Sequence, residues 1–212
     1  EHAAAGAHAD PGLHVHLTFD PAQDVAAPFL NLSKPKVAVL REQGVNSHVE
    51  MAYAFTEAGF EAFDVHMTDL QTGRVKLEDF KGAGIGWARS ITFNDVLSEQ
   101  FQGFFARPDT FGLGVCNGCQ MFAELADIIP GAQDWPRFTT NQSERFEARL
   151  SLVEVLESPS LFFADMAGSR LPIAVAHGEG FANFKYRGNA DKAIAAMRFV
   201  DNAGAPTEQY PF

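Results

Sequence analysis

Two cysteines give the sequence its clearest potential for chemistry. Cys116 lies at the centre of the segment Gly114-Val115-Cys116-Asn117-Gly118, and Cys119 follows three residues later. A nucleophile with a glycine two residues away on each side is typical of a nucleophile elbow, a strained turn between a strand and a helix. The N–H groups and dipole at the start of a helix favour a thiolate. The segment therefore predicts Cys116 to be an attacking nucleophile.

The residue after the nucleophile has a predicted role of its own, and the second cysteine leaves an alternative open. The backbone N–H of Asn117 is expected to stabilise the oxyanion of a tetrahedral intermediate. A Cys-x-x-Cys pair at the start of a helix is also typical of a thioredoxin-like oxidoreductase, which would need Cys119 as its resolving thiol. A third interpretation is an inactive binding or regulatory domain that keeps the elbow and has lost the general base. Two cysteines are too few for a disulfide framework.

Short apolar runs alternating with amphipathic segments must position this turn. We expect strands at 36–40, 60–66 and 110–115, and helices at 47–58, 91–105 and 120–126. A capping box of Ser47 and Glu50 is predicted to begin the first helix, and Gly59 to end it. This alternation predicts a doubly wound, mainly parallel α/β sheet. Later strands at 148–155 and 171–176, with little helix except around 160–166, predict antiparallel additions at one sheet edge.

The composition limits the class of partner. The 212 residues are 46% hydrophobic, enough for one sizeable core, and the net charge is -11. Because nucleic acids and anionic membranes attract clustered Lys and Arg, we expect neither as a partner. No apolar run reaches the roughly 18 residues that cross a bilayer, and we expect a soluble, cytoplasmic protein. Four of the seven histidines lie in residues 1–34 without spaced carboxylates or thiolates, so we expect no metal site.

Four motifs, in the same order, resemble those of one enzyme family. They are Val39-Leu40-Arg41-Glu42-Gln43-Gly44-Val45-Asn46, Gly114-Val115-Cys116-Asn117-Gly118-Cys119-Gln120, Arg145-Phe146-Glu147-Ala148-Arg149 and Ala176-His177-Gly178-Glu179-Gly180. The chain resembles the C-terminal class I (triad) glutamine amidotransferase domain of large-type phosphoribosylformylglycinamidine synthase. The resemblance implies a flavodoxin-like fold, with residues 35–212 as the glutaminase domain. Residues 1–34 resemble the end of a preceding synthetase domain and its linker.

The resemblance also implies a reaction and its partners. Cys116 would hydrolyse glutamine through a thioester, and Gln120, His177, Gly178 and Glu179 would lie near the substrate. The ammonia would serve the ATP-dependent conversion of formylglycinamide ribonucleotide to formylglycinamidine ribonucleotide. The implied partners are glutamine and the synthetase domain of the same polypeptide. No cofactor is expected in this chain, whereas ATP and Mg²⁺ are expected in the synthetase part.

The residue types by themselves leave plainer interpretations open for several of these positions. Gln120 also fits a first-turn polar residue bonded to local backbone, and His177 fits a hydrogen-bonded strand end. The charged residues Arg145, Glu147 and Arg149 alternate along a strand, which usually indicates a solvated face, although Arg145 could pair a carboxylate bidentately.

The sequence departs from the family pattern in two places. The family's catalytic His and Glu lie in a Pro-His-Pro-Glu segment, which residues 1–212 do not contain and which we expect beyond Phe212. The family also has a strand and a glycine-rich loop, the source of a second oxyanion donor, where this sequence passes from Gly82 to Ala83. Three glycines at 82–86 disfavour a central strand there. We therefore predict that Gly82 and Ala83 are not adjacent in the natural polypeptide and that the domain is incomplete at both places.

Overall fold

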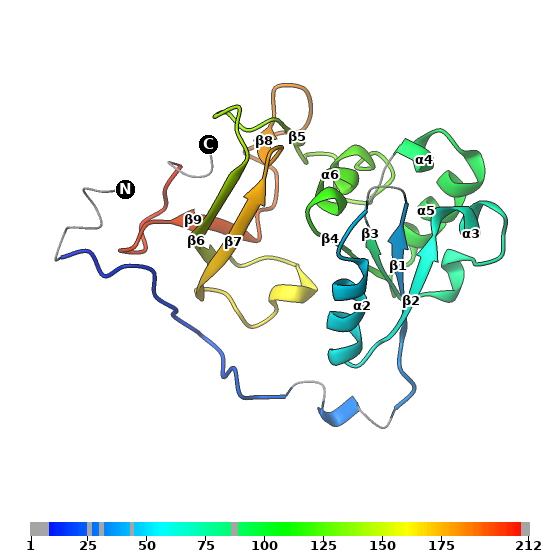
Figure 1. Cartoon of the computed structure of the whole chain (residues 1–212), viewed down its shortest axis with the longest axis horizontal. Coiled ribbons are helices and arrows are strands. Elements are labelled where there is room, and N and C mark those ends of the chain that lie inside the picture. The colour runs from blue at the N-terminus through cyan, green and yellow to red at the C-terminus, as the bar shows by residue number, and fades with distance from the viewer. Residues whose placement is uncertain (1–8, 25–26, 30–31, 43–44, 86–88, 209–212) are drawn as a thin grey trace. The chain divides into compact units, whose positions relative to one another are not determined.

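The chain folds into two compact units, which are described separately. The computed structural model describes residues 9–24, 27–29, 32–42, 45–85 and 89–208 (Figure 1). One unit, here the parallel-sheet unit, comprises Val25–Arg137 and Phe184–Asp191. The other, the antiparallel unit, comprises Glu1–Asp24, Phe138–Asn183 and Lys192–Phe212. Residues 9–24, expected to end a preceding domain, thus group with the antiparallel strands, and the domain boundary near residue 34 stays a prediction.

Four parallel strands form the sheet of the parallel-sheet unit, in the order β2-β1-β3-β4. They are β1 (Lys36–Arg41), β2 (Glu61–His66), β3 (Gly82–Ile85) and β4 (Phe111–Gly114). The helices of this unit are η1 (Ala27–Phe29), α2 (His48–Glu57), α3 (Met67–Gln71), η2 (Leu77–Asp79), α4 (Arg89–Thr92), α5 (Asp95–Ala106) and α6 (Asn117–Glu124). The predicted doubly wound, mainly parallel α/β fold is confirmed.

Side chains of β1 alternate between two hydrophobic cores, one on each face of the sheet. Val37 and Val39 pack in the core that contains Phe55 of α2. Ala38 and Leu40 belong to the larger core, which includes residues of α3, α5 and α6. These four residues of β1 are at most 2% exposed. Because successive side chains of a strand point to opposite faces, this alternation fixes the layered arrangement of helix, sheet and helix.

The helix boundaries differ from the sequence prediction in two ways. Ser47 has a left-handed backbone (φ 61°) and makes no side-chain cap, so the predicted capping box is wrong. The predicted helix 91–105 is divided into α4 and α5, because Asn94 caps α5 by accepting a hydrogen bond from Leu97 N–H at 3.1 Å. Gly59, with φ 91°, follows the end of α2 as predicted.

A central strand forms where the glycine content argued against one. β3 pairs with β1 on one side and β4 on the other, with Gly82 opposite Phe111 and Ala83 opposite Gly112. The prediction that this segment is not a strand is therefore wrong, and Gly82 and Ala83 take consecutive positions in it. Gly86 and Trp87 lie outside the described residues. The prediction that the natural polypeptide has further residues between Gly82 and Ala83 stays untested. The missing strand no longer supports it, because β3 supplies that strand.

The antiparallel unit contains two small sheets. Strand β6 (Glu147–Val155) lies between β7 (Arg170–His177) and β9 (Met197–Val200), and β5 (Arg137–Thr139) pairs with β8 (Phe181–Asn183). Among the described residues these strands form sheets of their own and do not extend the edge of the parallel sheet. The helix expected at 160–166 is a single 3-10 turn, η3 (Leu161–Phe163). His16, near the start of the described chain, forms an isolated antiparallel bridge with Arg170.

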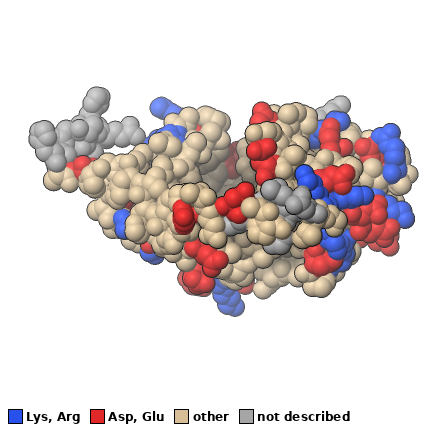
Figure 2. All heavy atoms as spheres, turned by 90° about the horizontal axis from the view of Figure 1, so that it is seen from below, with Lys and Arg blue, Asp and Glu red and all other residues tan. Residues whose placement is uncertain are grey.

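The surface mixes charges of both signs. On the face drawn in Figure 2, Lys and Arg side chains lie next to Asp and Glu over the parallel-sheet unit. The ion pairs of this unit include Lys81 with Asp109 and Arg137 with Glu124. None of the helices in the described ranges is long and apolar enough to span a bilayer.

Candidate active site

Cys116 lies on the turn that joins β4 to α6. β4 ends at Gly114, and α6 begins at Asn117, directly after the cysteine. The cysteine backbone has φ 56° and ψ -115°, a conformation that residues with a side chain rarely adopt, and the residue is exposed. Such a backbone costs on the order of 1–3 kcal/mol and is concentrated at functional sites. The predicted strand-to-helix turn at the carboxyl end of a parallel strand is present.

The two glycines of the motif allow the backbone to fold back on itself. A Cβ atom on Gly114 would lie 2.6 Å from the carbonyl oxygen of Gly118 and 2.7 Å from Cδ2 of Phe122. Gly118 N–H in turn donates to the carbonyl of Val115 at 2.9 Å. The close approach inferred from the Gly-x-Cys-x-Gly spacing is therefore found, and it explains why Gly114 cannot carry a side chain without displacing its neighbours.

The first turn of α6 begins directly at the nucleophile. Cys119 N–H and Gln120 N–H both donate to the carbonyl of Cys116, at 3.0 and 3.3 Å. Asn117 N–H has no acceptor within the described ranges of the chain, and its role as an oxyanion donor stays a prediction. The Cys116 sulfur lies 4.0 Å from Oδ1 of the Asn117 side chain. Gln120 lies in the same first turn and is half-buried. These three predicted site residues are thus neighbours at the start of one helix.

The two cysteines occupy different environments. Both are free thiols, with Cys116 exposed and Cys119 partly buried. Burial raises the pKa of the Cys119 thiol, and the nearby charge of Cys116 raises it further. A thiol with a raised pKa is mostly protonated near neutral pH, so Cys119 is the poorer nucleophile of the pair.

The other predicted site residues lie in the antiparallel unit, at the end of β7. His177 is the last residue of β7, and Gly178 and Glu179 follow it in a turn before β8. The side chain of Asn141, which the sequence analysis did not single out, forms hydrogen bonds with this turn. The only signal in the sequence was a polar residue in a loop, and nothing in its neighbours indicated that it is 2% exposed.

The charged motif that begins β6 is not a fully solvated face. Glu147 is 7% exposed, and its carboxylate accepts a hydrogen bond from Arg149. Hydrogen bonds from Ser143 and Arg149 lower the pKa of Glu147, and the charge of His177 lowers it further. Glu147 also lies opposite His177 in the β6–β7 register. The interpretation of this stretch as a solvated face is therefore wrong for Glu147.

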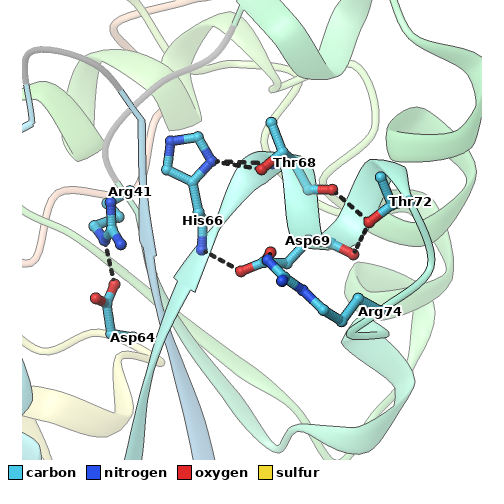
Figure 3. Close-up of polar contacts among 7 residues, drawn as sticks. All are labelled: Arg41, Asp64, His66, Thr68, Asp69, Thr72 and Arg74. Carbon is cyan, nitrogen blue, oxygen red and sulfur yellow. Dashed lines mark hydrogen bonds and ion pairs between the residues drawn. The ribbon is translucent and has the colours of Figure 1, made fainter.

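A second polar group lies at the carboxyl ends of β1 and β2 (Figure 3). The His66 side chain accepts a hydrogen bond from Thr68 N–H at 3.2 Å, and Asp69 accepts one from His66 N–H at 3.2 Å. This reciprocal pair caps the short helix α3. Arg74 forms an ion pair with Asp69. Because His66 is used as a cap, its role here is to position the polypeptide after β2.

No cluster of three or more potential metal ligands occurs in the part of the chain that the structure describes. Two of the N-terminal histidines considered as ligands, His2 and His8, lie outside the described residues. His14 contacts the carbonyl of Gly12 at 3.1 Å.

Comparison with protein families gives the class of this domain. The family of CobB/CobQ-like glutamine amidotransferase domains matches residues 34–212. Since the match spans most of the sequence, the chain belongs to that family. It is a glutamine amidotransferase domain, an enzyme class whose substrate is glutamine, and its elbow cysteine lies within the matched range. The thioredoxin-like alternative for Cys116 and Cys119 finds no support.

Three solved structures have similar folds. A chain from the structure of PurLQS from Thermotoga maritima has a TM-score of 0.61 and 18% identity, covering 80% of this chain and 76% of its own. A glutamine amidotransferase from Thermotoga maritima has a TM-score of 0.44 and 18% identity, with coverages of 72% and 64%. A putative GMP synthase component from Thermoplasma acidophilum has a TM-score of 0.43 and 17% identity, with coverages of 70% and 66%. The first of these bears out the fold.

Proposed function

We propose that this domain is the glutaminase part of a phosphoribosylformylglycinamidine synthase, with Cys116 as its nucleophile. The observation that carries the proposal is an exposed cysteine with φ 56° on the turn between β4 and α6. A strained, exposed thiol at a helix start suits covalent attack on a carbonyl carbon. The finer assignment to purine biosynthesis rests on the four motifs that occur in the family's order.

The first half of the reaction forms a thioester. The Cys116 thiolate attacks the carboxamide carbon of glutamine, and the carbonyl electrons move to the oxygen. Asn117 N–H donates a hydrogen bond to this oxyanion. When the oxyanion collapses, the C–N bond breaks, and the nitrogen takes a proton and leaves as ammonia. Gln120, His177, Gly178 and Glu179 are proposed to bind the rest of the substrate.

The second half regenerates the thiol. Water attacks the glutamyl thioester, the C–S bond breaks, and glutamate leaves, so that glutamine and water yield glutamate and ammonia overall. These proton transfers need a general base. The family's base and its orienting carboxylate lie in a Pro-His-Pro-Glu segment, which residues 1–212 do not contain. We therefore assign the base to no residue of this sequence.

The ammonia is proposed to be used elsewhere. It would pass to a synthetase domain of the same polypeptide, where formylglycinamide ribonucleotide is converted to formylglycinamidine ribonucleotide. That conversion depends on ATP and Mg²⁺, which are bound by the synthetase part under this proposal. The residues of this chain supply only the nucleophile, the oxyanion donor and the glutamine contacts.

A glutaminase assay on the intact polypeptide, with and without the acceptor nucleotide, tests the proposal. We expect Cys116→Ser to lower glutamine hydrolysis at least 100-fold, and the matched variant Cys119→Ser to retain it. A chloroketone analogue of glutamine should label Cys116 and spare Cys119, as read by peptide mapping. Hydrolysis that survives Cys116→Ser would refute the proposal, as would label on Cys119 alone. A wild-type chain without hydrolysis under either condition would instead be an inactive amidotransferase domain, the result expected if Gly82 and Ala83 are joined and the second oxyanion donor is lost.

A further inference from the structure

Asn141 is a buried side chain whose hydrogen-bonding groups are all used. It lies in the loop between β5 and β6 and is 2% exposed. Its Nδ2 donates to the carbonyls of Arg145 (2.9 Å) and His177 (2.8 Å). Its Oδ1 accepts from Gly180 N–H at 2.9 Å and lies 2.9 Å from Nδ1 of His177. Its own backbone N–H donates to the carbonyl of Gly178 at 2.9 Å. One residue thus holds the whole turn from His177 to Gly180.

These bonds determine which ring nitrogen of His177 carries the proton. The side-chain amide of Asn141 has one orientation, because a reversed amide would place its oxygen against two carbonyl oxygens. Oδ1 therefore faces Nδ1 of His177, and an amide oxygen can only accept a hydrogen bond. The neutral imidazole must carry its proton on Nδ1, which leaves a lone pair on Nε2. Within the ranges that the structure describes, Nε2 has no hydrogen-bond partner.

Gly180 independently constrains the same imidazole. A Cβ atom at this position would lie 2.3 Å from Cε1, 2.4 Å from Nδ1 and 2.5 Å from Nε2 of His177. The ring therefore lies directly against the Gly180 backbone, in space that any side chain would occupy. Together, the Asn141 hydrogen bond and the Gly180 contact restrict the ring's rotation. A polar side chain that is preorganised in this way loses little conformational entropy when it binds a ligand.

We propose that Asn141 is a positioning residue for substrate recognition. It keeps the His177 proton on Nδ1, so that Nε2 accepts a hydrogen bond from a donor group of the substrate. Glutamine offers two such donors, its α-ammonium group and its carboxamide NH₂. The proposal rests on the proposed function, since it takes glutamine as the ligand of the turn from His177 to Gly180. Asn141 acts through His177 and does not itself contact the substrate.

The tautomer of His177 tests the positioning role without any activity measurement. In protein labelled with ¹⁵N-histidine, held well above the ordinary histidine pKa of about 6.5, we expect Nδ1 to be protonated and Nε2 bare. His177→Gln identifies the signal among the seven histidines. Asn141→Ala should shift the ring toward the Nε2–H tautomer. A proton on Nε2 of His177 in the wild type would overturn the proposal. The same tautomer of His177 in the wild type and in Asn141→Ala would overturn it as well.

Glutamine kinetics on the intact polypeptide test the link to the substrate. Loss of one positioned hydrogen bond to the substrate should raise KM for glutamine about tenfold in Asn141→Ala, with a smaller change in kcat. Asn202→Ala removes another side-chain amide of the antiparallel unit, one bonded to Asp10 at 2.8 Å, and should leave KM unchanged. A shifted tautomer with an unchanged KM would refute the substrate role of Nε2. If Asn141→Ala does not fold, the wild-type spectrum still decides the tautomer. Failure of the proposed function is separate, because it appears as hydrolysis that survives Cys116→Ser.

Discussion

The close approach beneath the nucleophile makes Gly114 the most informative residue to change. In Gly114→Ala the new Cβ would lie 2.6 Å from the oxygen and 2.7 Å from the carbon of the Gly118 carbonyl. Non-bonded carbon atoms normally approach to about 3.5–4.0 Å. Because the obstructing atoms belong to the backbone of α6, the clash cannot be relieved by rotating a side chain. Either β4 or the start of α6 must move, and Cys116 moves with it.

Two effects of known size follow from this displacement. Overpacking of this kind costs roughly 1–3 kcal/mol of unfolding free energy, which lowers the Tm of a chain of this length by about 2–12 °C. A shift of about 1 Å in a reacting atom reduces rates about 100-fold. Gly103→Ala is the matched control, because Gly103 is an exposed residue of α5 and its Cβ would meet nothing within 4 Å. In a helix this exchange should raise stability by about 0.5–1 kcal/mol.

Urea denaturation and the labelling rate of Cys116 measure both effects on the same proteins. We expect Gly114→Ala to be less stable than the wild type and to react much more slowly with a chloroketone glutamine analogue. Gly103→Ala should be slightly more stable and should react at the wild-type rate. If Gly114→Ala were as stable as Gly103→Ala and labelled at the normal rate, the elbow geometry inferred for this turn would be wrong.

Three further predictions concern single side chains. Because glycine tolerates a positive φ, Cys116→Gly should have a higher free energy of unfolding than Cys116→Ala, by about 1–3 kcal/mol. Urea titrations measure this difference, and equal stabilities would show that the backbone is not strained. Because burial raises the pKa of Cys119, iodoacetamide at pH 8 should modify Cys116 first in peptide maps, and preferential modification of Cys119 would contradict this. The pKa of Glu147 is held below its ordinary 4.5, so its charge stabilises the fold above that pH and the contribution is lost as pH falls through the lowered pKa. The stability difference between wild type and Glu147→Gln should therefore be largest near pH 7 and should close in acid, and a pH-independent difference would refute the assignment.

The local features of the fold and the elbow were predictable because each depends on residues close in sequence. Apolar periodicity located β1, β2 and β4, and the alternation of strands with helices gave the parallel sheet. The spacing of Gly114 and Gly118 around Cys116 predicted a turn with two close backbone segments, and the structure has that turn. A motif of five residues contains all the information that this geometry needs.

The features that were missed depend on partners far apart in the sequence. Asn141 is buried because its side chain bonds to residues 36 and 39 positions away, which no local pattern reveals. Glu147 is buried where β6 pairs with β7, opposite His177, which lies 30 positions later in the sequence. In each case a residue type gave the right local tendency, and tertiary contacts decided the outcome.

The glycines of β3 show why the same residue type led to one correct prediction and one wrong one. The prediction at Gly82 and Gly84 considered only the entropy that glycine loses in a strand. The structure shows the compensating packing, since a Cβ at Gly82 would lie 2.3 Å from the ring of Phe111, and one at Gly84 would lie 3.2 Å from Cγ of Met51. These glycines provide space for the partly buried side chains of Phe111 and Met51, which pack in the core that contains Phe55. The prediction at Gly114 rested on what a side chain would touch, and the structure has that close approach to the Gly118 carbonyl.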